Sequence, residues 1–198
     1  MEAALLAFGV QLQGRTCADV GSSTGGFTDC LLQHGAVRVY AIDVGHGLLD
    51  WKLRQDPRVV VMEDTNARFI TRLPEAVQLV TMDVSFISLK VMLPVVRDWL
   101  INPQHGTVIA LVKPQFEAGR REASRGKGVI RDPAIHRQVL LDVLNYAKEL
   151  GYAVRGLLRS PLTGPKGNQE FLAWLEYGGV QDNLIETLIE AVVPLPAS

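Results

Sequence analysis

The stretch that most constrains the fold is DVGSSTGGFTD at residues 19–29, which continues from the short apolar run TCADV. Three glycines and several hydroxyl side chains stand where a buried strand would end and a helix would begin. A glycine-rich turn of this kind lets a ligand approach the backbone closely and offers it the unpaired N–H groups of the helix start. We therefore predict a ligand-binding turn between a strand and a helix.

Apolar, β-branched runs alternate with helix-like segments along almost the whole chain, the pattern of a parallel sheet with helices on both faces. No linker or repeat interrupts it, so residues 1–198 are predicted to form a single domain. The predicted strands are 15–20, 37–42, 58–62, 78–83, 107–112, 152–159 and 169–177. The predicted helices are 24–34, a short one after Leu48, one after Asn66, one from Ser88 and a long one from Pro133, capped by Asp132 and closed by Gly151.

The last two predicted strands are joined by SPLTGPKGN, which is too short for a helical crossover and rich in turn-forming residues. Such a connection indicates an antiparallel pair. A mostly parallel seven-stranded sheet that ends in an antiparallel hairpin strand is typical of Rossmann-like class I methyltransferases, whereas simple dinucleotide-binding folds are commonly all-parallel. The predicted fold class is therefore an α/β methyltransferase.

Composition excludes several other classes of protein. The chain is 47% hydrophobic and 21% charged, as globular proteins are, and its apolar runs are far shorter than the ~20 residues of a membrane span. No signal peptide is expected, and two cysteines give neither a disulfide framework nor a zinc spacing. We expect a cytoplasmic protein without a metal site. Four isolated histidines are expected at the surface or at helix caps: His34, His46, His105 and His136.

The ligand of the turn is predicted to be a nucleoside. Ser23 stands where the second glycine of GxGxxG belongs, which weakens a dinucleotide interpretation. Asp43 ends the second predicted strand about 20 residues on, where an acid can bind both hydroxyls of a ribose. Asp19 and Gly21 suit the amino-acid end of S-adenosylmethionine, which has no pyrophosphate. A tight structural turn without a ligand is the alternative.

Asn66, which follows the third predicted strand, either meets the adenine or only caps a helix. The candidate cofactor-binding residues are Asp19, Gly21, Ser22, Ser23, Thr24, Gly25, Gly26, Phe27, Asp43, Asn66 and Asp83.

Three ionisable residues are predicted to meet at one edge of the sheet. Asp83 and Lys113 end parallel strands, and Glu170 begins an antiparallel one, so all three belong to the carboxyl edge beside the ligand. Methylation of an alcohol requires a group that removes a poorly acidic proton or stabilises the growing negative charge, which a lysine flanked by carboxylates supplies. A ribose 2′-hydroxyl is such an alcohol. Ordinary surface charges or salt bridges are the alternative.

Other methyl acceptors fit the residues less well. Adenine amino-group methylation usually comes with a proline pair and an aromatic residue after the fourth strand, where this chain has DVSF. Cytosine carbon methylation needs a nucleophilic cysteine at the edge, whereas Cys17 is predicted inside a strand and Cys30 inside a helix.

These motifs together resemble the TlyA family, the "hemolysin A" relatives of the FtsJ-type RNA ribose methyltransferases. The resemblance implies a class I methyltransferase fold, S-adenosylmethionine as donor and 2′-O-methylation of ribosomal RNA. It also implies that Asp83, Lys113 and Glu170 match the last three members of a catalytic Lys-Asp-Lys-Glu set. The segments that carry it are DVGSSTGGFTD, VYAIDVGHGLLDWKLRQDPRVVVMEDTNAR, MDVSFISL, LVKPQFE, GKGVIRDP and SPLTGPKGNQEF.

The departure from the family lies at the front of the chain. Family members carry an S4-type RNA-binding domain and then a segment with the first catalytic lysine, whereas this sequence opens at MEAALLAFGV. Either it is a trimmed catalytic core or the protein lacks both pieces, and methylation of ribosomal subunits is then expected to be weak.

The net charge is −1, but residues 113–137 hold seven bases and three acids, so one segment is basic on an otherwise acidic protein. The 119–131 stretch is therefore the candidate contact to RNA phosphates, and a solvated loop explains it equally well. Alternatives for the whole chain are a membrane-active hemolysin, a nucleotide-binding oxidoreductase and an RNA-binding module without methyltransferase activity. The candidate RNA-binding residues are Arg120, Arg121, Arg125, Lys127 and Arg131.

Overall fold

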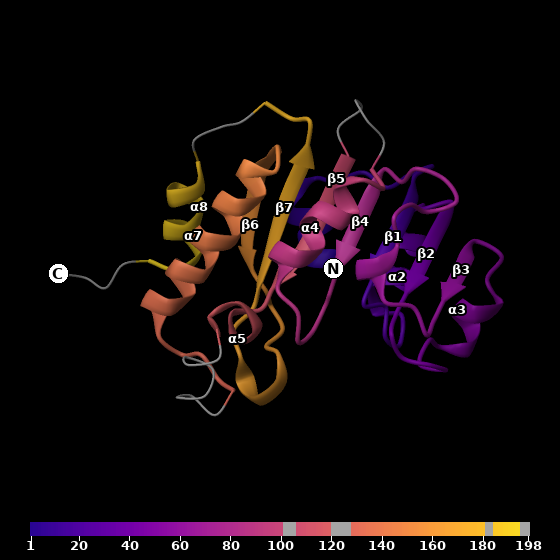
Figure 1. Ribbon diagram of the computed structural model, residues 1–198, viewed down its shortest axis with the longest axis horizontal. Helices are drawn as coiled ribbons and strands as arrows, with labels where there is room; N and C mark the ends of the chain where they lie inside the picture. The colour runs from indigo at the N-terminus through magenta and orange to yellow at the C-terminus, as the bar shows by residue number, and fades with distance from the viewer. Residues whose placement is uncertain (101–105, 120–127, 181–183, 195–198) are drawn as a thin grey trace.

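The computed structural model describes residues 1–100, 106–119, 128–180 and 184–194. Within these ranges seven strands form one sheet in the order β3-β2-β1-β4-β5-β7-β6 (Figure 1). The pairs among the first five strands are parallel, and β7 runs antiparallel to both β5 and β6. The predicted mostly parallel sheet with an antiparallel C-terminal strand is confirmed. Its strands are β1 (Thr16–Val20), β2 (Arg38–Ile42), β3 (Val59–Met62), β4 (Leu79–Met82), β5 (Gly106–Val112), β6 (Tyr152–Arg159) and β7 (Phe171–Tyr177).

The predicted helices are present except for the one after Asn66, and α1, α5 and α8 come in addition to them. Asp132 accepts a hydrogen bond from Ala134 N at the start of α7, and Pro133 occupies the first turn, as expected for this helix. The segment after Asn66 is a single 3₁₀ turn. The helices are α1 (Glu2–Phe8), α2 (Gly26–Gln33), α3 (Trp51–Gln55), α4 (Leu89–Arg97), α5 (Pro114–Glu117), α7 (Pro133–Glu149) and α8 (Ile185–Val192), with 3₁₀ turns η1 (Ala67–Phe69) and η2 (Pro165–Gly167).

Helices cover both faces of the sheet, as predicted. Successive residues of a strand point to opposite faces, so each strand contributes to two cores. On one face, Ile42 belongs to a core with buried residues of α4, α7 and α8. On the other, Ala41 belongs to a core with buried residues of α1, α2 and α3. The central strands are therefore buried on both sides, which leaves their carboxyl ends as the place for polar chemistry.

The carboxyl edge collects residues from distant parts of the sequence. Val112, the last residue of β5, pairs with Phe171, the first residue of β7, and Phe171 also pairs with Arg159, the last residue of β6. Consequently the residue after β5 and the residue before β7 lie at the same edge. Two strands are slightly shorter than predicted: β4 ends one residue earlier, so Asp83 follows it, and β7 begins two residues later, so Glu170 precedes it.

The expectation that all four histidines lie at the surface or at caps is wrong for His136. This side chain is buried in α7, since its Nε2 lies 3.0 Å from the carbonyl oxygen of Ile130 and its ring packs edge-on against Phe171. His34 is the C-terminal cap of α2, as expected, and His105 lies outside the described residues.

Candidate active site

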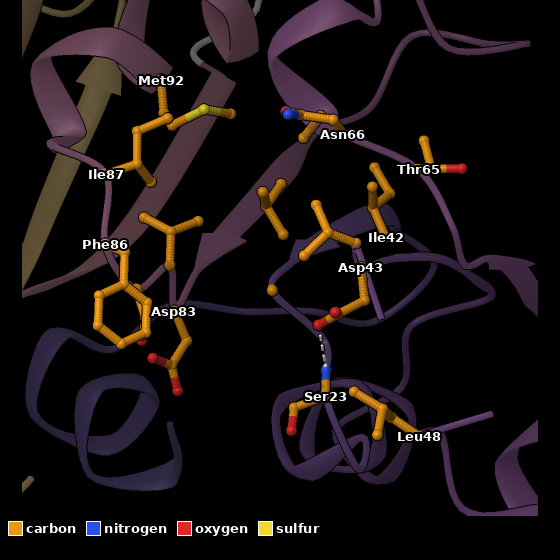
Figure 2. Close-up of a pocket in the computed structure, with 16 residues that line it drawn as sticks. Ser23, Ile42, Asp43, Leu48, Thr65, Asn66, Asp83, Phe86, Ile87 and Met92 are labelled. Atoms are coloured by element: carbon orange, nitrogen blue, oxygen red, sulfur yellow. Dashed lines mark hydrogen bonds between the residues drawn. The ribbon is translucent and has the colours of Figure 1, made fainter. Parts of the chain in front are cut away.

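A cavity of about 350 Å³ opens at the carboxyl ends of β1, β2 and β4. Figure 2 shows Asp83 and Phe86 on one side of it, Asp43 and Ser23 on the other, and Asn66 at a third wall. The volume falls within the usual range of small-molecule sites. Five of the predicted cofactor-binding residues line it: Gly21, Ser23, Asp43, Asn66 and Asp83.

The glycine turn is shaped by close backbone contacts. Gly21 has a φ of 81°, and a Cβ at this position would overlap the carbonyl oxygen of Asp83. The N–H groups of Gly21 and Ser22 donate to the carbonyl oxygen of Ile42 at the end of β2. The turn therefore needs glycine at position 21 because the chain after β4 passes directly against it.

Asp43 joins the turn to the end of β2. Its Oδ2 accepts a hydrogen bond from Ser23 N over 2.8 Å, and its Oδ1 accepts one from Gly45 N over 2.7 Å. These two bonds fix the carboxylate at the cavity wall (Figure 2). Each oxygen of an ionised carboxylate accepts more than one hydrogen bond, so Asp43 keeps capacity for the hydroxyls of a ribose.

Asn66 caps a short helical turn and also lines the cavity, while its contact with the adenine stays a prediction. Its Oδ1 accepts a hydrogen bond from Arg68 N and so caps η1. The residue also lines the cavity between Thr65 and Ala67, where Figure 2 shows its amide. Capping engages the oxygen, which leaves the Nδ2 group as the donor available to a ligand.

Asp19 lies beneath the turn and does not line the cavity. It is fully buried, and its two oxygens accept hydrogen bonds from the hydroxyls of Thr28 and Thr81, over 2.7 and 2.8 Å. Burial raises the pKa of Asp19 to about 6, against the hydrogen bonds from the two threonines, which lower it. This carboxylate therefore ties the start of α2 to β4 under the ligand site.

The rest of the glycine stretch builds the wall behind the turn. Gly25 has a φ of 99° and packs against Leu49 and Leu53, with which any Cβ would overlap. Gly26 begins α2. The predicted residues that lie outside the cavity lining, besides Asp19, are Ser22, Thr24, Gly25, Gly26 and Phe27.

Asp83 and Lys113 meet next to this cavity. Lys113 Nζ lies 2.5 Å from Asp83 Oδ1 and donates a hydrogen bond to Ser85 Oγ over 3.1 Å. The lysine is 9% exposed, whereas the Asp83 side chain is about one-third exposed and faces the cavity. The ammonium group is thus held on the β4 side, beside the ligand site.

Glu170 lies on the other side of the same lysine. It is 5% exposed, and its Oε1 accepts a hydrogen bond from Gln115 Nε2 over 2.8 Å. Burial raises the pKa of Glu170, the hydrogen bond from Gln115 and the charge of Lys113 lower it, and the charge of Asp83 raises it. The three predicted catalytic residues therefore form one electrostatically coupled group.

Two features of the site were missed in the sequence. Gln115 stands directly after Lys113-Pro114, where sequence alone does not distinguish a helix-start residue from a partner of Glu170. Phe86 lines the cavity although it is 91% exposed, has a φ of 64° and packs at a tilt against Phe116 with ring centroids 4.9 Å apart. A positive φ at an aromatic residue is strained and is found mainly at functional sites.

Most of the predicted RNA-binding residues lie outside the described ranges, namely Arg120, Arg121, Arg125 and Lys127. Arg131 is described and is exposed just before α7. Across the described ranges, no group of three or more His, Cys, Asp or Glu side chains could hold a metal ion. None of the helices in these ranges is long and apolar enough to cross a membrane.

Comparison with known proteins agrees with this geometry. The model of the FtsJ-like methyltransferase family matches residues 1–177. The chain is 48% identical over 176 residues to the 16S/23S rRNA (cytidine-2′-O)-methyltransferase TlyA of Mycobacterium tuberculosis. That match covers 87% of this chain and 64% of the relative, so the chain spans less than two thirds of its length.

Two solved structures are also similar. The "putative hemolysin" of Lactococcus lactis is 45% identical, with a TM-score of 0.88 over 96% of this chain and 93% of that one. A "putative S-adenosylmethionine dependent methyltransferase" of Listeria monocytogenes is 16% identical, with a TM-score of 0.65 over 89% of this chain and 98% of that one. The second likeness is one of fold alone.

Proposed function

Since the chain belongs to the FtsJ-like methyltransferase family, we propose that it transfers a methyl group from S-adenosylmethionine to a ribose 2′-hydroxyl of ribosomal RNA. The observation that carries the proposal is the ion pair of Lys113 with Asp83 at the border of the cavity, with Glu170 on the far side of the lysine. The activity for which the Mycobacterium tuberculosis relative is named supports the choice of acceptor.

The donor set of the cavity suits an adenosyl group. Asp43 supplies carboxylate oxygens for the two ribose hydroxyls, and Asn66 supplies an amide donor for the base. Apolar side chains of Ile42, Ile87 and Met92 line the space around them, as an aromatic base requires. S-adenosylmethionine, when bound, supplies an electrophilic methyl group on a sulfonium.

Lys113 carries the central part of the proposed chemistry. Its Nζ, fixed by Asp83 and Ser85, stabilises as an ammonium the negative charge that develops on the 2′-oxygen, or, once it has given up a proton, accepts the proton of the 2′-hydroxyl as a neutral amine. Glu170 and Asp83 flank the ammonium and set its orientation. The near-complete burial of Lys113 and Glu170 strengthens these interactions, because the local dielectric is low.

The basic residues before α7 are the proposed RNA contacts of the chain, with Arg131 as the described member. Phosphate contacts position an RNA strand without selecting its sequence. We expect the chain to bind S-adenosylmethionine by itself.

The test separates cofactor binding from transfer. Calorimetric titration with S-adenosylmethionine, and with NADH as the rival ligand, is expected to show binding of the first only. Lys113→Ala is then expected to keep cofactor binding and to lose transfer of a labelled methyl group to ribosomal RNA by more than a hundredfold. Lys52→Ala, at an exposed position of α3, is the matched control. Transfer that survives in Lys113→Ala would refute the proposed role.

A further inference from the structure

A second cavity, of about 310 Å³, lies at the same edge of the sheet beyond Glu170. Its lining includes Arg131, which precedes α7, Arg159, which ends β6, and Gln169, which is adjacent to Glu170. We name it the Arg131–Arg159 cleft. No residue of the candidate active site described above lines it.

The cleft carries an excess of positive charge. Both of its arginines are exposed, and within the described residues neither has an ion pair or a side-chain hydrogen bond. No aspartate or glutamate of the described chain lines the cleft. The adjacent Asp132 is engaged at the start of α7, where its Oδ1 accepts a hydrogen bond from Ala134 N over 2.8 Å. As far as the described part of the chain goes, two guanidinium groups are therefore available to an anion.

The backbone that carries Arg131 is held by buried side chains. Ile130 N donates to Asn168 Oδ1, and the Ile130 carbonyl oxygen lies 3.0 Å from His136 Nε2. Asn168 is 2% exposed and also donates to the carbonyl oxygen of Gly128. Because both polar groups of Ile130 are bound, the position of the next residue is fixed before any ligand arrives. A site whose backbone is already fixed binds a ligand at a lower entropic cost than a mobile segment does.

The position of the cleft in the sheet determines how far it lies from the reacting group. At the carboxyl edge the strand order β1-β4-β5-β7-β6 places the glycine turn first, then Asp83, Lys113, Glu170 and finally Arg159. Adjacent strands are about 4.8 Å apart, so Arg159 starts roughly 10 Å from the strand that carries Lys113. An RNA strand whose acceptor ribose lies at Lys113 can therefore place a neighbouring phosphate in the cleft.

We infer that the Arg131–Arg159 cleft binds a backbone phosphate of the RNA strand that presents the acceptor ribose. This inference rests on the proposed function. Guanidinium groups bind phosphate oxygens in a planar, paired geometry, which two arginines facing one cavity supply. The contact positions the strand and carries no base specificity.

Binding of a short fluorescein-labelled single-stranded RNA, followed by anisotropy at several salt concentrations, tests the inference. Arg159→Gln is expected to weaken binding on the order of fivefold at 0.1 M salt, and to lower the slope of log K against log salt by about 0.7. The same loss is expected for oligocytidylate and oligoadenylate. Arg72→Gln, which removes an exposed guanidinium from the segment before β4, is expected to change neither quantity.

Arg131→Gln serves as the second variant, with the same expected loss, in case Arg159→Gln unfolds. An unchanged affinity and slope in both folded variants would overturn the inference. Inorganic phosphate is titrated in parallel, and variants that lose phosphate binding but keep RNA binding would equally overturn it. Calorimetry with S-adenosylmethionine tests the donor site of the proposed function separately, because the donor cavity and the cleft share no lining residue.

Discussion

Gln115 donates a hydrogen bond from Nε2 to Glu170 Oε1 over 2.8 Å, while its own Oε1 is buried and has no hydrogen-bond partner among the described residues. An unpaired buried acceptor costs about 1–3 kcal/mol. The amide nevertheless turns its donor, not its acceptor, toward the glutamate. This orientation matches an ionised Glu170, because a protonated carboxyl could donate to the amide oxygen instead. Gln115 is therefore placed to favour the charged form of Glu170.

Replacement of Gln115 by leucine should shift the acid limb of the pH–activity profile to higher pH. The hydrogen bond from Gln115 lowers the pKa of Glu170, so its loss raises that pKa further above the ordinary value. If transfer requires ionised Glu170, the variant loses activity first at low pH and recovers as the pH rises. The measurement is the rate of methyl transfer at saturating donor against pH.

Gln138→Leu is the control for this comparison, since Gln138 is exposed on α7 and its amide bonds only Asp142 there. Its profile should coincide with that of the unmodified chain. A Gln115→Leu profile that is lower by the same factor at every pH would contradict the proposed control of ionisation.

Gly164→Ala should lower methyl transfer because it displaces the side chain of Glu170. A Cβ at Gly164 would overlap Oε1 and Cδ of Glu170, although the backbone φ of −71° is acceptable for alanine. The carboxylate must then leave its present position, which disturbs the hydrogen bond from Gln115. Transfer is expected to fall roughly as far as in Glu170→Gln, on the order of tenfold to a hundredfold. Calorimetry should show that both variants bind the donor like the unmodified chain, and a Gly164→Ala enzyme with full activity would be incompatible with this packing.

Gly21→Ala should damage the cofactor cavity and the fold together. The substitution forces a Cβ into the carbonyl group of Asp83 at a φ of 81°, so we expect a loss of roughly 2–4 kcal/mol in the free energy of unfolding. Gly26→Ala is the matched control, because no atom lies within 4 Å of its added Cβ and the residue begins α2. Urea unfolding should show Gly26→Ala to be as stable as the parent chain or slightly more stable.

The sheet was predictable because each strand leaves a strong local signal. Strands buried on both faces appear as short apolar runs, and Asp83, Lys113 and Glu170 stand at their ends, so topology alone brings them to one edge. Short helices were harder to predict from the sequence. α1 and α5 have seven and four residues, too few for a clear periodic pattern, and tertiary contacts decide their conformation.

The roles of individual polar side chains were less accessible to sequence. The pattern DVGSSTGG predicts a ligand turn, but it does not tell which polar groups face the ligand and which face inward. Asp19 lies within β1 near its end and bonds two threonines beneath the turn, whereas Asp43 directly follows β2 and reaches the cavity. The difference depends on side-chain direction along strands of the same kind. Likewise, burial of His136 follows from the tertiary position of Ile130.

The buried Asp19 should make stability depend on pH in a defined direction. Its pKa in the folded protein is about 6, raised by burial above that of the unfolded chain. Between these two values the folded state binds more protons than the unfolded state, so the free energy of unfolding falls as the pH rises. The stabilisation is complete below the unfolded pKa and is lost as the pH passes about 6. Over that window one such group changes stability by up to about 3 kcal/mol.

Asp19→Asn removes this titration while keeping an oxygen acceptor and an amide donor for the hydroxyls of Thr28 and Thr81. Half-buried Glu117 and buried Glu170 also have raised pKa values, but they titrate in both proteins, so the difference between the two stability curves isolates Asp19. Urea unfolding from pH 4 to pH 7 should show the variant gaining stability relative to the parent chain as the pH rises. Asp29→Asn, at an exposed position of α2, is the control: the difference in stability between this variant and the parent chain should stay constant from pH 4 to pH 7. Parallel curves for Asp19→Asn would mean that the carboxyl group is solvated well enough to ionise normally.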